Sequence, residues 1–210
     1  TAEDGTILSN WMLPGEYLVY EQLDEQSIYW CESENPQAVT IKAGETAEVT
    51  FTNRLKPGKI AIQKVDVTGK PLAGAEFLLE WSVDGKTWQP VSHTDSQYVL
   101  EGTCTSAGLK DGKLVSDETG LVEFTGLHPE RLYRLTETAA PDGYQLLADT
   151  AYEGGLPADT ELTIQLTVVN VPTFELPKTG SKSMLLMPIS LALAAALCGA
   201  ILVIGKRKKL

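Results

Sequence analysis

The chain has 210 residues and a net charge of −11 at pH 7, and it contains three cysteines and two histidines. An acidic surface of this kind stays soluble and argues against nucleic-acid binding, which needs lysines and arginines on the phosphates. His93 and His128 have no partner at metal-ligand or catalytic-triad spacing. We therefore expect no metal and no other cofactor, and we place both histidines in surface loops.

Residues 1–53 have the pattern of β-strands separated by turns. Tyr17–Tyr20 and Ala47–Thr52 are rich in strand-forming residues, and Pro14-Gly15 marks a turn before the first of them. Residues 1–5 are neither basic nor apolar, so they do not form a signal peptide. Because the C-terminal features described below indicate export, which requires such a peptide, we expect the sequence to be a fragment whose N-terminal part is missing.

A linker at residues 54–58 precedes a second region with strand signals, residues 59–172. Asp84-Gly85 marks a hairpin turn, and we interpret the polar segment His93–Ser116 as an inserted surface loop. No convincing helical period occurs before residue 184, so the predicted class is all-β with β-sandwich domains. The strand signals of this region are Ile60–Val65, Ala75–Trp81, Leu121–Phe124, Leu132–Thr138 and Leu162–Val171.

The two regions repeat each other. The segment Leu13–Glu21 is similar to Leu127–Glu137, and 32 residues separate Glu21 from Asn53 where 33 separate Glu137 from Asn170. We interpret residues 1–53 as the C-terminal part of a truncated domain and residues 59–172 as one complete copy. The offset of 116 residues between the two glutamates indicates tandem domains, since solenoid repeats are much shorter.

The C-terminal part has three elements in order. The pentapeptide Leu176-Pro177-Lys178-Thr179-Gly180 lies in a linker, residues 173–183. Residues 184–205 carry no charge and, as a helix, are long enough to cross a hydrocarbon core of ~30 Å. Residues 206–210 begin with four consecutive cations, which favour the cytoplasmic side. We therefore predict a transmembrane helix, with everything before Gly180 outside the cell.

This order of pentapeptide, apolar span and basic tail resembles the LPXTG cell-wall sorting signal of Gram-positive surface proteins. The resemblance implies that sortase, a membrane transpeptidase, cuts between Thr179 and Gly180 and joins Thr179 to an amine of peptidoglycan or of a pilin. The membrane would hold the chain only transiently, and the mature protein would lie in the cell wall at the extracellular surface. The alternative is a chance LPKTG in front of an ordinary transmembrane helix.

Residues 59–172 resemble the prealbumin-like (CnaB-type) repeat of collagen adhesins and pilins. In that family a lysine amine and an asparagine amide condense to an isopeptide bond with the help of an acid. The resemblance thus implies Lys64 and Asn170 as the cross-linked pair and Glu137 as the residue that assists the reaction. The blocks that carry the resemblance are Lys64–Asp66, Gly69–Phe77, Glu137–Tyr144 and Val169–Pro172.

The alternation of side chains along a strand tests whether these three residues can meet. Lys64, Glu137 and Asn170 each fall on the apolar face of their own strand. Burial disfavours the charged forms of lysine and glutamate alike, so a neutral amine could attack an amide polarised by a protonated acid. Taken singly, the lysine could instead reach solvent, the asparagine could cap its strand, and the glutamate could form a buried ion pair.

Glu21 and Asn53 are the equivalents of the acid and the asparagine in the truncated copy, which has no lysine on a first strand. We expect no disulfide, because Cys31 and Cys104 then lie in different domains and Cys198 lies in the apolar span. The isopeptide cross-link would therefore take the stabilising role that disulfides have in many exported domains.

These features predict a cell-wall-anchored surface protein, not an enzyme, that forms the structural stalk of a pilus subunit or adhesin. Its expected partners are sortase, the amine acceptor in peptidoglycan or in a pilin, and the membrane before sorting. A host extracellular-matrix ligand, bound through upstream domains, is a further candidate. Two alternatives stay open. Residues 93–116 could bind a host ligand, or the chain could be the wall-anchor region of an exoenzyme whose catalytic domain lies upstream.

Overall fold

The computed structural model describes residues 2–157 and 161–174. The predicted sorting pentapeptide at 176–180, membrane span at 184–205 and basic tail at 206–210 lie outside these residues. The described residues form fourteen strands and no helix, which confirms the all-β class. Within that part of the chain no helix is long and apolar enough to cross a membrane.

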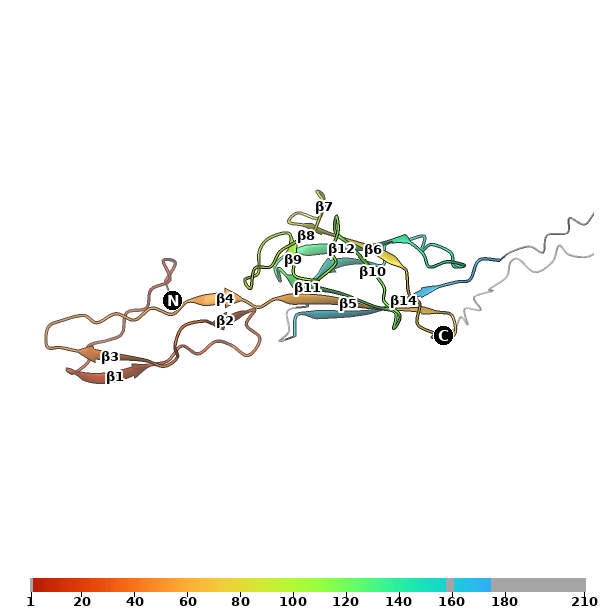
Figure 1. The fold of residues 1–210 in the computed structure, drawn as a ribbon. Helices are drawn as coiled ribbons and strands as arrows, with labels where there is room; N and C mark the ends of the chain where they lie inside the picture. Colours follow the sequence, from red (N-terminus) through yellow and green to blue (C-terminus); the bar gives the residue numbers. More distant parts are fainter. Residues whose placement is uncertain (1, 158–160, 175–210) are drawn as a thin grey trace, which may run out of the picture. The chain divides into compact units, whose positions relative to one another are not determined.

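Strands β5–β7 and β10–β14 form a sandwich of two sheets that lie face to face (Figure 1). One sheet has three strands in the order β11-β5-β14, and the other has the order β10-β6-β12-β13, with β7 paired to β6. These strands are β5 (Gly58–Asp66), β6 (Glu76–Ser82), β7 (Gln89–Pro90), β10 (Lys113–Val115), β11 (Leu121–Leu127), β12 (Leu132–Ala139), β13 (Tyr152–Gly155) and β14 (Thr163–Asn170). The five predicted strands of this region are all present, whereas β13 lacked a recognisable sequence signal because its Tyr-Glu-Gly-Gly sequence has low strand propensity.

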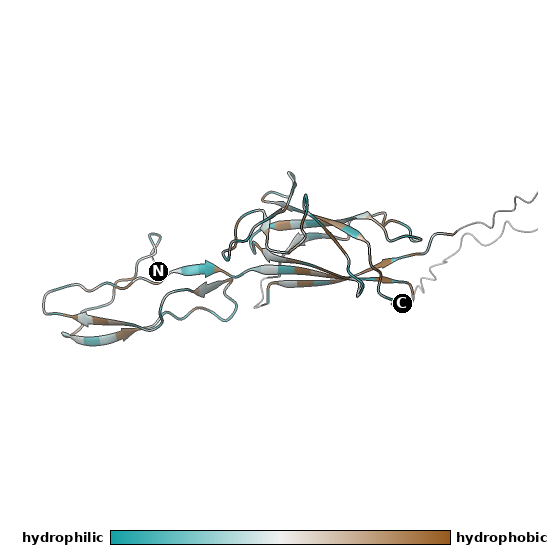
Figure 2. Ribbon diagram, in the orientation of Figure 1, coloured by the Kyte–Doolittle hydropathy of each residue, from teal (hydrophilic) through white to brown (hydrophobic). Residues whose placement is uncertain are grey.

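The core lies between the two sheets and follows directly from strand alternation. On β5, Ile60 and Ile62 are fully buried while the intervening residues are half-exposed. Phe77 and Leu79 on β6 and Leu135 on β12 fill the facing side, all with no exposed surface. Hydrophobic and hydrophilic stretches alternate along these strands in Figure 2. Alternation of this kind is expected when one face of a sheet is buried and the other is solvated.

The first and last strands of the sandwich are neighbours. β14 runs parallel to β5, so that Lys64 pairs with Val168 and Asp66 with Asn170. β11 pairs with the other side of β5 in antiparallel register. A parallel pair needs a long crossover, and here almost the whole domain lies between the two strands. The two ends of the domain therefore meet in one sheet.

The segment His93–Ser116 was expected to be a surface loop, and that expectation is wrong in part. It contributes the second residue of β8 (Ser92–His93) and all of β9 (Thr103–Cys104) and β10. Cys104 is fully buried in the core, because β8 and β9 pair in parallel and turn this side chain inward. The expectation for His128 is also wrong in part: the residue lies in the loop between β11 and β12, but it is only 9% exposed and its carbonyl accepts a hydrogen bond from the Tyr133 hydroxyl at 3.0 Å.

Residues 2–55 contain four short strands, β1 (Gly15–Val19), β2 (Tyr29–Cys31), β3 (Gln37–Ile41) and β4 (Asn53–Leu55). β1 pairs with β3 and β2 with β4, both antiparallel. The predicted strand Tyr17–Tyr20 overlaps β1, which ends at Val19, but the one predicted at Ala47–Thr52 is wrong, because β4 begins only at Asn53. The backbone N–H and C=O groups of a strand need hydrogen-bonding partners on a neighbouring strand. Residues 47–52 lack such a neighbour, because the described residues contain no counterpart of β5.

The pairing of β1 with β3 has the register of the pairing of β12 with β13. Tyr17 lies opposite Val39, and Tyr133 lies opposite Gly154. These positions differ by 116 residues (133 − 17) on the first strand and 115 (154 − 39) on the second. The repeat seen in the sequence is thus reproduced in the pairing of strands. Residues 2–55 retain one ladder of the sandwich and have no counterpart of β5 or β6.

Candidate functional site

Three polar side chains meet inside the sandwich, each delivered by a different strand. Lys64 comes from near the end of β5, Glu137 from near the end of β12 and Asn170 from the last position of β14. They are 0%, 2% and 2% exposed. Polar groups are rarely buried this completely without partners, because burial costs their hydration. The three residues predicted from the sequence therefore form one buried cluster, and the alternative that Lys64 reaches solvent is wrong.

Glu137 lies at the centre of the cluster and contacts both other residues. One carboxylate oxygen, Oε1, lies 3.9 Å from Nζ of Lys64. The other, Oε2, accepts hydrogen bonds from Nδ2 of Asn170 at 2.9 Å and from the backbone N–H of Leu147 at 2.8 Å. The acid is thus held between the amine and the amide, with a backbone donor fixing its orientation.

The hydrogen bonds of Lys64 and Asn170 fix where their reactive groups lie. Nζ of Lys64 donates to the carbonyl of Val168 at 3.0 Å, which holds the amine against β14, two residues before the asparagine. Nδ2 of Asn170 also donates to the carbonyl of Gln145 at 2.6 Å. Because both N–H groups of the amide are occupied, its nitrogen and its oxygen cannot exchange places. Asn170 acts as an internal hydrogen-bonding residue and does not simply cap its strand.

Two buried oxygen atoms in the cluster accept no hydrogen bond from the described residues: Oε1 of Glu137 and Oδ1 of Asn170. A buried acceptor without a donor costs roughly 1–3 kcal/mol. Both atoms would gain from a hydrogen-bond donor or from a bond that changes the groups around them. The arrangement is costly while the three side chains remain separate. A reaction between them would account for it.

Burial lowers the pKa of Lys64 from its usual value of 10.5, and the nearby Glu137 carboxylate opposes this shift only in part. The lysine therefore loses its proton more readily than a lysine in water does. Only the unprotonated amine has the lone pair that attacks a carbonyl carbon. The cluster thus brings together an acid, an amide and an amine that can act as a nucleophile, in a site that excludes water.

The backbone around Lys64 is closed on one side by the turn before β11. The backbone N–H of Lys64 donates to the carbonyl of Gly120 at 2.7 Å, and its carbonyl accepts from the N–H of Leu72 at 3.0 Å. Gly120 has φ +77, a conformation that L-residues with a side chain rarely adopt. These contacts fix the height of Lys64 along β5 relative to the other two residues. Leu72 lies in the block Gly69–Phe77 that carries the resemblance, but no sequence pattern indicated a role for it or for Gly120.

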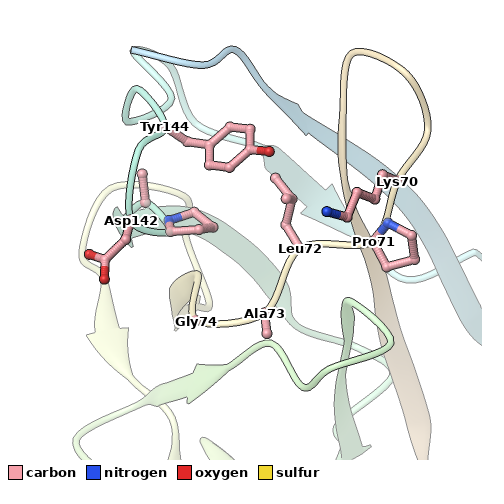
Figure 3. Close-up of a pocket in the computed structure, with 9 residues that line it drawn as sticks. Lys70, Pro71, Leu72, Ala73, Gly74, Asp142 and Tyr144 are labelled. Atoms are coloured by element: carbon pink, nitrogen blue, oxygen red, sulfur yellow. The ribbon is translucent and has the colours of Figure 1, made fainter. Parts of the chain in front are cut away.

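A shallow cleft of about 380 Å³ lies at the same end of the sandwich. It is lined by Lys70–Gly74 and by Ala140, Pro141, Asp142 and Tyr144. In Figure 3 Leu72 and Tyr144 face each other across it, while the carboxylate of Asp142 points away. Its polar groups do not converge on one point, as they do in a ligand site. We therefore interpret the residues that line the cleft as packing that closes this end of the domain, not as a ligand site.

The predicted equivalents in residues 2–55 also pair. Nδ2 of Asn53 donates to Oε1 of Glu21 at 2.8 Å. Unlike Asn170, Asn53 is exposed, and the described residues place no lysine beside this pair. The backbone of Glu21 is held by the side chain of Asn35, which donates to the Glu21 carbonyl at 2.7 Å and accepts from its N–H at 3.1 Å.

Two family models match the chain. The prealbumin-like fold domain model, SpaA, matches residues 58–171, which is more than half of the sequence. The model of the LPXTG cell wall anchor motif matches residues 169–209. Comparison with curated protein sequences finds no match.

The chain is similar to several solved structures, among them two of pilus proteins. The Bacillus anthracis TIE protein is 24% identical with a TM-score of 0.51, covering 76% of this chain and 25% of that one. The group B streptococcus pilus 2b backbone protein is 21% identical with a TM-score of 0.45, covering 76% and 55%. Two domains of the major pilin SpaD from Corynebacterium diphtheriae are 21% identical with a TM-score of 0.41, covering 66% and 54%. The chain thus spans between a quarter and just over half of these relatives.

Proposed function

The chain belongs to the prealbumin-like SpaA domain family and is a pilin-like surface protein of the cell wall, and from this we propose that residues 59–172 form a covalently stapled stalk module. The staple is an isopeptide bond between Lys64 and Asn170, formed once by the folded protein itself with Glu137 as acid and proton relay. The observation that carries the proposal is the buried cluster, in which the acid contacts both partners and two oxygens lack donors.

The reaction is a transamidation that needs no cofactor. Neutral Nζ of Lys64 attacks Cγ of Asn170 while protonated Glu137 donates a hydrogen bond to the amide oxygen. The new C–N bond forms, the bond from Cγ to Nδ2 breaks, and ammonia leaves with a proton that Glu137 relays from the lysine. Excluding water favours the reaction, because it strengthens the electrostatic effect of the acid and prevents hydrolysis.

The position of the bond supports a mechanical role. It would join β5 to β14, the two strands at which the chain enters and leaves the domain. Tension on the chain would then act on the covalent bridge rather than on the hydrogen bonds between the strands. By analogy with a disulfide that closes a loop of about 100 residues, the bond is worth roughly 4–5 kcal/mol.

We further propose that sortase processes this protein at its LPXTG motif. Residues 184–205 would hold the chain in the membrane, and each of the four cations from Lys206 to Lys209 would cost on the order of 2.5–3.5 kcal/mol at the bilayer centre. This retention in the membrane gives sortase time to cut after Thr179 and to transfer the chain to an amine of peptidoglycan or of a pilin.

The geometry favours this structural role over a host-ligand site in residues 93–116. Cys104 of that segment is fully buried, and Leu109 and Leu114 pack against the core, so much of the segment serves the sandwich itself. Both matched families are structural or anchoring modules rather than enzymes. The exoenzyme alternative has no observation in its favour.

Intact mass spectrometry of the chain ending at Thr179 tests the cross-link. The mass should be one ammonia below the value calculated from the sequence, and proteolysis should release one branched peptide containing Lys64 and Asn170. Lys64→Ala, Asn170→Ala and Glu137→Ala should each restore the calculated mass. Lys59→Ala is the matched control, since this lysine lies on the same strand but pairs with Glu123 at the surface, and it should keep the mass loss. A wild-type mass equal to the calculated value would overturn the proposal.

A further inference from the structure

β14 is an edge strand of the three-stranded sheet. It pairs with β5 on one side, and no strand of the described residues pairs with its other side. The backbone N–H of Lys59 donates to the carbonyl of Leu162 at 3.0 Å, so the backbone groups of the even-numbered residues that follow face β5. The odd-numbered residues turn the same groups away from the sheet. Between 163 and 169 they are Thr163, Gln165, Thr167 and Val169.

The other sheet edges in the described part of the domain are short or covered. The backbone N–H of Thr105 donates to the carbonyl of Thr125 at 2.8 Å, which covers β11. β7 and β8 have two residues each, β10 has three including Lys113, and β13 has four, two of them glycine. Short strands, proline and lysine are common means of preventing two sheet edges from pairing. β14 has eight residues with no proline and no charge, so it lacks this protection.

Apolar side chains along β14 are incompletely covered. Ile164 and Leu166 pack against the core, and in the register they lie beside Ile60 and Ile62 of β5. The two β5 residues have no exposed surface, whereas Ile164 and Leu166 are only half-buried. On the outer face of the strand, Val169 is 43% exposed. A further strand beside β14 would cover these side chains and would also satisfy the outward backbone groups.

The open stretch of β14 has a defined centre. Beyond its C-terminal end, the carbonyl of Val171 accepts a hydrogen bond from the backbone N–H of Gln145 at 2.9 Å, which closes the edge there. The stretch from residue 163 to residue 169 is therefore centred on Leu166. A two-fold axis at Leu166 would pair two copies of β14 antiparallel, with Gln165 of one copy opposite Thr167 of the other.

This register is self-complementary. It places residues with outward backbone groups opposite each other, so each such pair can exchange two hydrogen bonds. On the core side, Leu166 would lie opposite Leu166 of the second copy and Ile164 opposite Val168, in the pairs whose side chains approach most closely. The half-buried apolar residues of each copy would thus cover those of the other.

The charge of the chain favours a second copy at this edge and at no other described edge of the sandwich. Two chains that each carry a net charge of −11 repel each other over most of their surfaces. β14 brings no like charges together, because it has no charged residue. We propose that the open edge of β14 binds β14 of a second copy antiparallel, so that their two three-stranded sheets form one continuous sheet. The two-fold symmetry closes the assembly as a dimer. Because the two copies of β14 run in opposite directions toward their anchors, this dimer suits chains on two facing cell surfaces.

Sedimentation equilibrium of the chain ending at Thr179, over a concentration series that reaches the millimolar range, tests the dimer. A monomer–dimer equilibrium is expected. Thr167→Pro should abolish it and keep the fold, because the Thr167 N–H points away from β5 and proline is tolerated at such edge positions. Thermal unfolding of dilute samples verifies the fold of the variant. A wild-type chain that stays monomeric at every concentration overturns the inference.

Charge variants test the register. Gln165→Lys combined with Thr167→Lys places lysines opposite each other in the two copies, and Gln165→Glu combined with Thr167→Glu places glutamates opposite each other. Each double variant should be monomeric, whereas their mixture should form a heterodimer, because opposite charges then face each other. Gln89→Lys, a change at an exposed glutamine of β7 in the other sheet, is the matched control and should dimerise like the wild type. The inference is overturned if the lysine variant still dimerises or if the mixture stays monomeric.

Hydrogen exchange distinguishes a second copy from a segment of the same chain. The amides of Gln165, Thr167 and Val169 should exchange rapidly in dilute solution and slowly once the dimer forms. The amides of Leu166 and Val168, which face β5, should exchange slowly at both concentrations. Slow exchange of the odd-numbered amides in the monomer would mean that residues 175–179 of the same chain cover the edge, and it would overturn a second copy as the occupant.

Discussion

Lys64 and Asn170 point to the same buried face of two adjacent parallel strands, offset by two residues in the register. The offset matters because residues directly opposite each other in a parallel pair extend side by side, whereas an offset lets a long side chain reach along the neighbouring strand. The lysine amine accordingly hydrogen-bonds the carbonyl of Val168, on the path toward the asparagine. Glu137 approaches from the facing sheet and contacts both.

Loss of the cross-link should lower the stability of the domain substantially. Asn170→Ala leaves the sandwich strands in place but removes the covalent closure, so the free energy of unfolding should fall by roughly 4–5 kcal/mol. Urea denaturation of the chain ending at Thr179, followed by tryptophan fluorescence, measures the difference. The surface variant Lys59→Ala should stay within about 0.5 kcal/mol of the wild type. Equal stability of wild type and Asn170→Ala contradicts a staple between β5 and β14.

The unlinked Asn170→Ala variant should become more stable as the pH rises toward 10.5. Burial lowers the pKa of Lys64 below 10.5, so between the lowered pKa and 10.5 the unfolded chain binds more protons than the folded one. Stability then rises with pH over that window and is lost as the pH falls through the folded pKa. Adding Lys64→Met to this variant removes the titrating group and should flatten the slope. If denaturation midpoints of the two variants change with pH in parallel, Lys64 is not the group responsible.

Gly120→Ala should slow formation of the cross-link as well as destabilise the domain. A Cβ at this position would collide with the backbone carbonyl of Lys64, in a residue whose φ of +77 already disfavours a side chain. The cost should exceed the ~1 kcal/mol typical of an incompatible glycine replacement, because the backbone of β5 must move. Gly69→Ala is the control: its φ is +86, but a Cβ there meets nothing within 4 Å.

The measurement for this pair of glycine variants is the fraction of chains that have lost ammonia at successive times after purification. Gly69→Ala should show nearly complete loss, while Gly120→Ala should lag behind. Cross-linking at the same rate in both would mean that the turn at Gly120 does not position Lys64.

Replacing Thr179-Gly180 with Ala-Ala should keep the protein in the membrane fraction of a Gram-positive host. The acyl transfer proposed for sortase needs the Thr179 carbonyl, and without it the apolar span remains attached. The parent protein should become extractable only after digestion of peptidoglycan, with Thr179 as its last residue. Extraction of the parent by detergent alone, with Cys198 still attached, would contradict processing at this motif.

Alternation along the strands was readable from the sequence because it depends only on local geometry. The inward positions of Lys64, Glu137 and Asn170 followed from their spacing to Ile62, Leu135 and Val168, and the structure places all three in the interior. The all-β class and the sorting motif are equally local features, since each depends on residues that are adjacent in the chain.

The tertiary structure decided what depends on contacts between distant segments. Only the packing of the two sheets places the Glu137 carboxylate between the Lys64 amine and the Asn170 amide and leaves two buried oxygens without donors. The inward turn of Cys104, the burial of His128 and the missing strand at Ala47–Thr52 likewise depend on which strand lies beside which. A sequence gives the face on which a side chain lies, but the partner across the core is set by the pairing of strands and by the burial free energy of the whole domain.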